Sequence, residues 1–184
     1  MAQGREEYAI VLDFLQHGYV FDKRPSHRKP PIAQALGTNY FTLLELVPKP
    51  GVFLQPLEKV YIGEEKRDKI HHITGKLPPN KLTGTASNEL PHVVEELIMK
   101  REKEFVDFFN KAAPLTTRMH QLELLPGLGK KHMWEVIETR KEKLFESFED
   151  IKTRVKLMPD PKKIIIKRIL AEINGEEKHN LFVH

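Results

Sequence analysis

The sequence has no cysteine among its 184 residues. Disulfides and thiolate metal ligands are therefore excluded, and their absence fits a protein of the reducing cytoplasm. No apolar run approaches the roughly 18 residues that span a membrane. The first residues, MAQGREEYAIVLDF, lack the cationic region and apolar stretch of a signal peptide. We therefore expect a cytoplasmic protein with no membrane segment.

Recognisable patterns of catalysis and metal binding are also missing. His71 and His72 would point to opposite faces of a strand, and no histidines show HExxH or similar ligand spacing. The segment 127–131 is not a Walker loop, because the first glycine of GxxxxGK[ST] is absent and Lys131 stands where Ser or Thr is required. We therefore predict no enzyme activity, no cofactor and no metal site.

What the sequence does contain is positive charge gathered in two stretches. The net charge is only +4, but residues 151–170 hold seven basic residues against the single acid Asp160. A second run, residues 23–29, holds four basic residues and no acid. Two separated basic patches suit a polyanion better than a small acidic substrate. Ordinary solvated lysines are the alternative interpretation.

Residues 1–86 have the pattern of a small β-rich domain. Proline, glycine and asparagine separate short β-prone runs, which are enough for an OB-like β-barrel. The segment 22–39 is interpreted as a long loop, and loops of that length are usually functional or mobile. The β-prone runs lie at 8–15, 40–47, 59–63 and 69–77.

Barrels of this kind bind single strands by stacking bases on aromatic side chains above a cationic groove. Aromatic residues that could stack are Tyr40, Phe41 and Tyr61, although their apolar neighbours favour burial in the core. Cations that could contact phosphates from the long loop are Lys23, Arg24, Arg28 and Lys29.

After residue 86 the hydrophobic pattern changes to three- and four-residue steps, which predicts a helix. Ser87 or Asn88 can cap its start, with Pro91 in the first turn, and Pro114 ends it. We therefore predict a linking helix in the segment 87–113. It would join the β-rich domain to a third segment, 114–184.

The segment 114–184 is predicted to be all α-helical. Ser147 and Asp150 resemble a capping box, and Asp160 would cap a last helix that Asn174 and Gly175 stop. The tail 176–184 is either an added strand or a frayed end. The predicted helices lie at 116–124, 130–145, 148–157 and from 161 onward.

A glycine turn interrupts this helical pattern at residues 125–129, Leu-Pro-Gly-Leu-Gly, and Lys130 and Lys131 follow it. Lysine in a first helical turn is unfavourable beside the helix dipole, so two of them indicate that an anion arrives from outside. Glycine allows close backbone approach, and the first amides of a helix lack intrahelical partners. Such amides can bind one phosphate of a strand without reading its sequence.

These residues resemble the helix-hairpin-helix family of nucleic-acid-binding motifs, in which Pro126, Gly127, Leu128 and Gly129 would form the hairpin. Met133 stands where that family usually has alanine. A second, degenerate copy begins at Leu157, LMPDPKK, in which Asp160 replaces the glycine and would cap its own helix. Basic side chains of this copy that would contact nucleic acid as point charges are Lys162, Lys163, Lys167 and Arg168.

The whole layout, an α+β chain with an OB-like barrel, a linking helix and a tandem helix-hairpin-helix domain, resembles an uncharacterised family of archaeal proteins regarded as RNA- or DNA-binding. The resemblance implies a non-catalytic partner of nucleic acid. RNA and DNA both stay open, because phosphate contacts carry little of that information. The alternative is a protein-interaction adaptor of a ribosomal or repair assembly that uses the hairpins as a scaffold.

Overall fold

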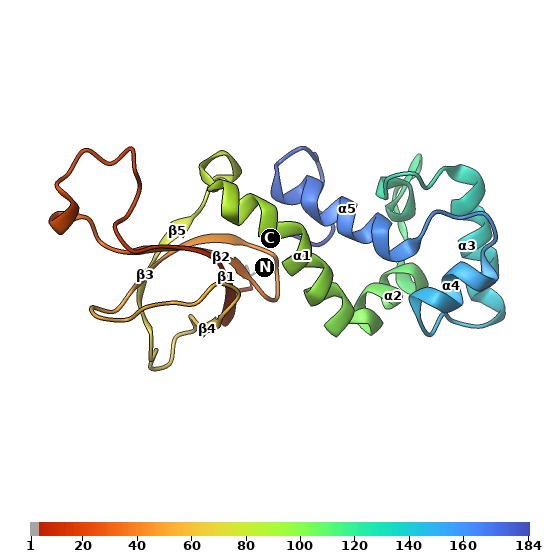
Figure 1. Ribbon diagram of the computed structural model, residues 1–184. Helices are drawn as coiled ribbons and strands as arrows, with labels where there is room; N and C mark the ends of the chain where they lie inside the picture. Colours follow the sequence, from red (N-terminus) through yellow and green to blue (C-terminus); the bar gives the residue numbers. More distant parts are fainter. Residues whose placement is uncertain (1–3) are drawn as a thin grey trace. The chain divides into compact units, whose positions relative to one another are not determined.

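The computed structural model describes residues 4–184 and has mixed α and β structure, as predicted (Figure 1). The chain clusters into two compact units. One runs up to Val93 and is joined by Glu172–His184, and the other is Val94–Ala171. We call them the sheet unit and the helical unit.

The sheet unit is built on a curled, five-stranded sheet with the order β4-β1-β2-β3-β5, in which every pair is antiparallel. Register shifts interrupt the β1–β2 and β3–β5 pairings, with the extra residues on β1 and β5, and such bulges bend a sheet. No pairing joins β4 to β5 among the described residues, so the curled sheet stays open as a half-barrel. The strands are β1 (Tyr8–Leu15), β2 (Ile32–Gly37), β3 (Leu43–Pro48), β4 (Lys59–Tyr61) and β5 (Ile70–Lys76).

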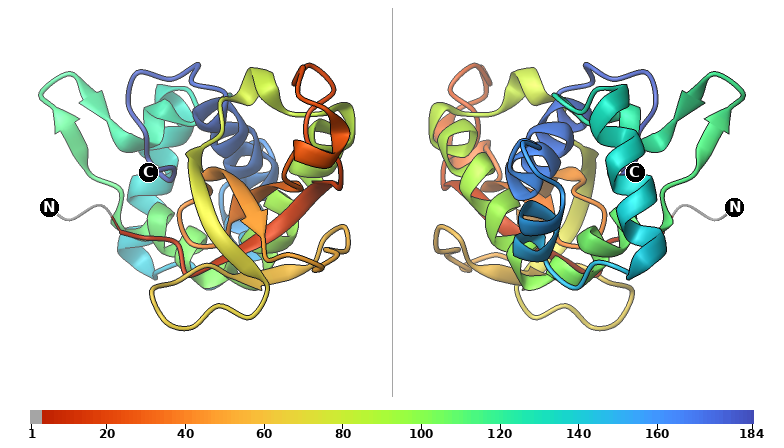
Figure 2. Two further views of the ribbon diagram at one scale, coloured as in Figure 1. Left: turned by 90° about the vertical axis from the view of Figure 1, so that its left-hand side faces the viewer. Right: turned by 90° about the vertical axis from the view of Figure 1, so that its right-hand side faces the viewer.

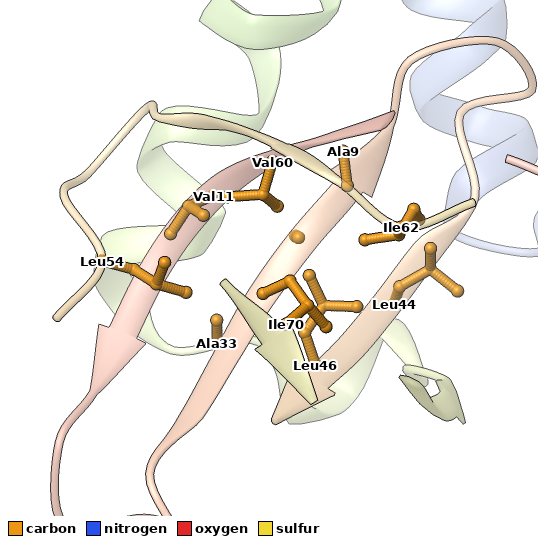
Figure 3. Close-up of a cluster of buried hydrophobic side chains, with 10 residues drawn as sticks. Ala9, Val11, Ala33, Leu44, Leu46, Leu54, Val60, Ile62 and Ile70 are labelled. Carbon is orange, nitrogen blue, oxygen red and sulfur yellow. The ribbon is translucent and has the colours of Figure 1, made fainter. Parts of the chain in front are cut away.

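The concave side of the sheet encloses the main core of this unit (Figure 3). Side chains from all five strands meet there, and Leu54 from the loop between β3 and β4 closes the cluster. Alternate residues of β1, such as Ala9 and Val11, point into it, as the period of a strand requires. Burial of these side chains supplies the main driving force for this half of the fold.

Strand β2 corrects the prediction of a long loop at 22–39. Its sequence IAQALG is rich in residues with little preference for strands, so the local pattern does not reveal it. All six residues are nevertheless buried between β1 and β3, and tertiary packing outweighs the weak propensity. The loop between β1 and β2 therefore covers residues 16–31 and carries a short 3-10 helix, η1 (Ser26–Arg28).

The predicted linking helix is two helices, α1 (Gly84–Lys100) and α2 (Glu102–Lys111). Helix α1 begins earlier than predicted because Thr83, rather than Ser87 or Asn88, caps it: the Thr83 hydroxyl accepts the amide of Ala86 at 3.1 Å. Arg101 lies between the helices with φ −121° and ψ 31°, where a tight turn replaces a helical one.

The helical unit continues with a small hairpin that corrects a second prediction. Residues 116–124 are not an α-helix, because β6 (Pro114–Thr116) pairs with β7 (Met119–His120) and the 3-10 helix η3 (Gln121–Leu124) follows. The β-branched residue Thr116 favours the extended form, and a turn at Thr117 and Arg118 then reverses the chain. The glycine turn therefore follows a single 3-10 turn rather than a full helix.

Three helices complete the chain, and Ser147, Asp160 and Gly175 lie at their ends as predicted, although the Asp150 carboxylate accepts the amide of Glu146 and does not complete a capping box. The Ser147 hydroxyl accepts the amide of Asp150 at 2.9 Å, the Asp160 carboxylate accepts the amide of Lys162 at 3.0 Å, and Gly175 has φ +71°. No helix of the described residues is both long and apolar enough to cross a membrane. The helices are α3 (Lys130–Glu142), α4 (Phe148–Arg154) and α5 (Pro161–Ile173), and the views of Figure 2 show their paths.

The tail after α5 belongs to the sheet unit and is held in place by two sets of hydrogen bonds. The amides of Leu181, Phe182 and Val183 all donate to Oε1 of Glu172. At the end of the chain, the Thr42 hydroxyl donates to the carbonyl of His184 at 3.1 Å. The tail therefore packs against the unit without adding a strand.

Candidate nucleic-acid interface

The glycine turn, residues 125–129, is anchored by its leucines and leaves its glycines exposed. Leu125 and Leu128 are buried, and the amide of Leu128 donates to the carbonyl of Leu125 at 3.2 Å. Gly127 has φ +77°, a left-handed conformation that favours glycine. The apolar residues thus fix the path of the chain, while the backbone of Gly127 and Gly129 faces solvent.

Gly129 is the N-cap of α3, and this cap lacks any side-chain hydrogen bond. Within residues 4–184, no acceptor pairs with the main-chain N–H of Gly129, Lys130 or Lys131. The first bond of the helix is the one from the Met133 amide to the Gly129 carbonyl, at 3.0 Å. A Cβ built at Gly129 would meet no atom within 4 Å. The positive end of α3 is therefore open to an incoming anion.

Two cations stand beside these amides. Lys130 and Lys131 are exposed, and neither forms an ion pair with any described acid. Trp134 lies one helical turn after Lys130 and is 58% exposed. The side chains of Lys130 and Trp134 line a shallow hollow, and Met133 and the β6–β7 hairpin form its other walls. Sequence reasoning missed Trp134, although its spacing of four residues from Lys130 on a helix was a usable signal.

At the second turn, between α4 and α5, a side chain occupies the first amides of the following helix. The Asp160 carboxylate accepts the amides of Lys162 and Lys163, at 3.0 and 3.5 Å. The ammonium of Lys162 pairs with Glu95 at 3.1 Å, whereas Lys163 is exposed. Arg168 is not a surface cation as predicted: it is buried and donates to the carbonyl of Leu124 at 2.8 Å. It therefore supports the approach to the glycine turn from inside.

The two turns can be aligned in the structure with Leu157 opposite Gly127. The sequence instead suggests Asp160 as the residue that replaces the glycine. Leu157 has φ +62°, as Gly127 has φ +77°, and the flanking Val155 and Met158 are buried as Leu125 and Leu128 are. A left-handed leucine costs roughly 1–2 kcal/mol relative to an ordinary conformation. Its side chain is 90% exposed, so the strain is not offset by burial.

His120 caps the 3-10 helix that leads into the glycine turn. Its Nδ1 accepts the amide of Leu122 at 3.1 Å, which requires a neutral ring, and its own amide donates to Glu123 at 2.8 Å. Burial, together with the charge of Arg140, lowers the pKa of His120, and Glu123 partly opposes this. The folded chain therefore holds this proton less tightly than the unfolded chain.

We expect the helical unit to lose stability as the pH falls below the ordinary histidine pKa of about 6.5. A group whose pKa is lower in the folded state contributes its full stabilisation above its pKa in the unfolded state. That contribution is lost as the pH falls toward its pKa in the folded state. His120→Asn should flatten this dependence, because an asparagine oxygen can keep the cap without titrating. Urea unfolding followed by the fluorescence of Trp134 between neutral and mildly acidic pH tests this, and parallel pH profiles of the two proteins would contradict it.

In the sheet unit, the predicted cations of loop 16–31 differ in their pairing. Arg24 forms a bidentate pair with Asp22 and lowers the pKa of that carboxyl to about 2. Lys29 donates to the carbonyl of Tyr19 at 3.2 Å. Lys23 and Arg28 are exposed, and no described acid lies within ion-pair distance of them.

The predicted stacking residues do not form an exposed surface. Phe41 is buried in the core, which is the alternative that its apolar neighbours favoured. Tyr40 and Tyr61 are partly buried and meet the rings of His184 and Tyr8 edge-on, with centroids 5.4 and 5.3 Å apart.

Residues 5–184 match the model of a family described as protein of unknown function, DUF655. The chain belongs to this family. It is 45% identical to the uncharacterised protein MJ0038 of Methanocaldococcus jannaschii over 178 residues, which cover 97% of this chain and 79% of that protein. It is also similar to the crystal structure of the DUF655 protein Af1531 of Archaeoglobus fulgidus, with 49% identity and a TM-score of 0.88. That match covers 97% of this chain and all of the other. Both relatives are archaeal, as the resemblance implied.

Proposed function

We propose that the protein binds nucleic acid without catalysis, holding the sugar–phosphate backbone at the glycine turn. The observation that carries this proposal is the uncapped N-terminus of α3, whose exposed amides stand beside two unpaired lysines. Amides and mobile cations together bind a phosphate oxygen without contacting a base. Binding would therefore be insensitive to sequence.

The contrast with the second turn supports a role for the first. Asp160 satisfies the amides of α5 internally and would repel a phosphate. Gly129 occupies the N-cap position of α3 but has no side chain to accept the first amides of that helix. The helix is therefore somewhat less stable than a capped one. An uncapped, exposed helix end followed by two lysines is explained by an external anion.

We also propose that the helical unit is a tandem helix-hairpin-helix domain and that the sheet unit is an OB-like domain. Two turns with matching buried and left-handed positions support a duplicated hairpin, although η3 replaces the first helix. A curled five-stranded sheet, open between β4 and β5, supports an OB-like β domain that adds a second contact. Either RNA or DNA could be the partner, because both present the same phosphates, and we favour RNA.

We expect the logarithm of the binding constant to fall linearly with the logarithm of salt concentration. Each lysine that neutralises a phosphate contributes about 0.9 to the slope on duplex DNA and about 0.7 on a single strand. Lys130→Gln and Lys131→Gln should each reduce the slope by that amount on every sequence. Lys141→Gln, in the last turn of α3 and paired with Glu138, is the matched control. Unaltered slopes in the first two variants would count against the glycine turn.

The adaptor alternative has one observation in its favour. Two exposed apolar side chains line the hollow beside α3, namely Met119 and Trp134. An adaptor would bind a protein through such a patch and would show no salt-dependent affinity for any oligonucleotide. A gel-shift series of single- and double-stranded RNA and DNA across salt concentrations separates the two functions.

A further inference from the structure

The loop between β1 and β2, residues 16–31, carries an exposed aromatic ring that sequence reasoning did not identify. Phe21 is 67% exposed, and its ring stacks on Tyr19 with centroids 4.7 Å apart and planes 13° apart. Among the described residues, Tyr19 contributes the one aromatic ring in contact with Phe21. The loop extends away from the strands of its sheet (Figure 1).

The ring of Tyr19, on which Phe21 stacks, is fixed to the sheet. The Tyr19 hydroxyl donates to Glu45 on β3 at 2.5 Å and accepts from the amide nitrogen of Gln34 on β2 at 3.3 Å. Burial and the carboxylate of Glu45 raise the pKa of Tyr19 to about 12, so the phenol remains a donor at neutral pH. Lys29 holds the backbone carbonyl of the same residue. Phe21 thus rests on a support that the strands position.

We propose that Phe21 is a stacking platform for one base of a single-stranded nucleic acid. The proposal rests on the proposed function and adds a substrate class to it, because bases within a duplex are already stacked and cannot reach such a ring. A single strand offers unstacked bases together with phosphates, and an exposed ring among cations suits both.

The charges of the loop favour a polyanion. Four cations stand against the single carboxylate of Asp22, which Arg24 already neutralises. Lys23 and Arg28 are left exposed for the phosphates on either side of the stacked base. A membrane surface would also attract these cations, but only Val20 and Phe21 of this loop are large exposed apolar residues. Two apolar side chains offer little surface to insert among lipids.

The test compares Phe21→Ala with Val20→Ala, a neighbouring exposed apolar residue that lacks a ring. We expect Phe21→Ala to bind oligo(U) and oligo(dT) at least about fivefold more weakly, the lower end of measured base-stacking effects. Binding to a duplex should be unaltered, as should all binding by Val20→Ala. Phe21→Trp should keep the affinity that Phe21→Ala loses. In a Trp134→Phe background, the fluorescence of the tryptophan introduced at position 21 should be quenched by the oligonucleotide. Far-UV circular dichroism and urea unfolding confirm that each variant is folded.

The outcomes separate this proposal from the function on which it rests. If Phe21→Ala binds single strands as the unaltered protein does, the platform is wrong while the glycine turn stands. If the unaltered protein binds no oligonucleotide at low salt, both proposals fail. If Phe21→Ala loses binding to phosphatidylserine vesicles but keeps its affinity for oligonucleotides, the loop is a membrane contact and the platform is again wrong.

Discussion

Gly129→Asp is expected to stabilise the helical unit while weakening nucleic-acid binding by about tenfold to a hundredfold. An aspartate at the N-cap of α3 would accept the free amides of the first turn, as Asp160 does in α5. The carboxylate also interacts favourably with the helix dipole, so we expect a gain of roughly 0.5–1 kcal/mol. The same carboxylate would displace the phosphate, and one lost charge-assisted hydrogen bond is worth about 1.5–3 kcal/mol.

Opposite changes in stability and affinity make this substitution more informative than a disruptive one. A variant that unfolds the turn would lose both stability and affinity, whereas a correctly capped turn becomes more stable and binds more weakly. The space around Gly129 is open and its φ of −79° is ordinary, so the side chain fits without strain. Gly127 is unsuitable for the same test, because its φ of +77° would strain any other residue.

Gly129→Asn is the matched control for charge. Asparagine caps a helix about as well as aspartate but carries no charge, so it occupies the amides without repelling phosphate. We expect an affinity between those of the unaltered protein and of Gly129→Asp. Fluorescence anisotropy with single-stranded and duplex oligonucleotides measures the binding, and thermal unfolding measures the stability. A more stable Gly129→Asp with undiminished affinity would show that the amides of α3 do not bind the backbone.

Local signals in the sequence predicted the features of this fold that depend on local physics. Strand β1 and the caps at Ser147 and Asp160 depend on alternation or on side chains two or three residues away. Strand β2 depends on neighbours distant in sequence, since alanine and glutamine become strand residues only when β1 and β3 enclose them. The segment 116–124 is a similar case, in which a hairpin forms where a helix was equally plausible locally.

The candidate site shows the same division. The glycine turn could be located from its residues alone, because glycine, proline and lysine each have a local reason to be there. Whether a lysine is free is a tertiary property: Lys162 is paired with Glu95 across 67 positions, and Arg168 is buried. Phe21 stands in no recognisable motif, and only the hydrogen bonds of Tyr19 to two strands give it a support.

Gln34→Leu is expected to have the largest effect on stability, a loss of roughly 3 kcal/mol in the free energy of unfolding. Gln34 lies in the middle of β2 and is fully buried. Its amide nitrogen donates to the carbonyl of Lys81 at 2.9 Å, and its oxygen accepts the amide of Thr83 at 2.9 Å. Leucine has a similar volume but leaves both partly buried backbone groups without their partner, and an unpaired group shielded from water costs about 1–3 kcal/mol.

Such a loss would be a large share of the roughly 5–15 kcal/mol by which most domains are stable. Gln16→Leu, at an exposed position of the same unit, is the control and should alter stability by no more than about 0.5 kcal/mol. Urea unfolding followed by far-UV circular dichroism measures both, and hydrogen exchange of the β2 amides reports the sheet unit alone. Because Gln34 also donates to Tyr19, the variant should loosen the support of Phe21 and weaken single-strand binding more than duplex binding. Equal stability of the two leucine variants would mean that water or a shifted backbone pairs with the carbonyl of Lys81 and the amide of Thr83. The hydrogen bonds of Gln34 would then not be what holds β2 to the start of α1.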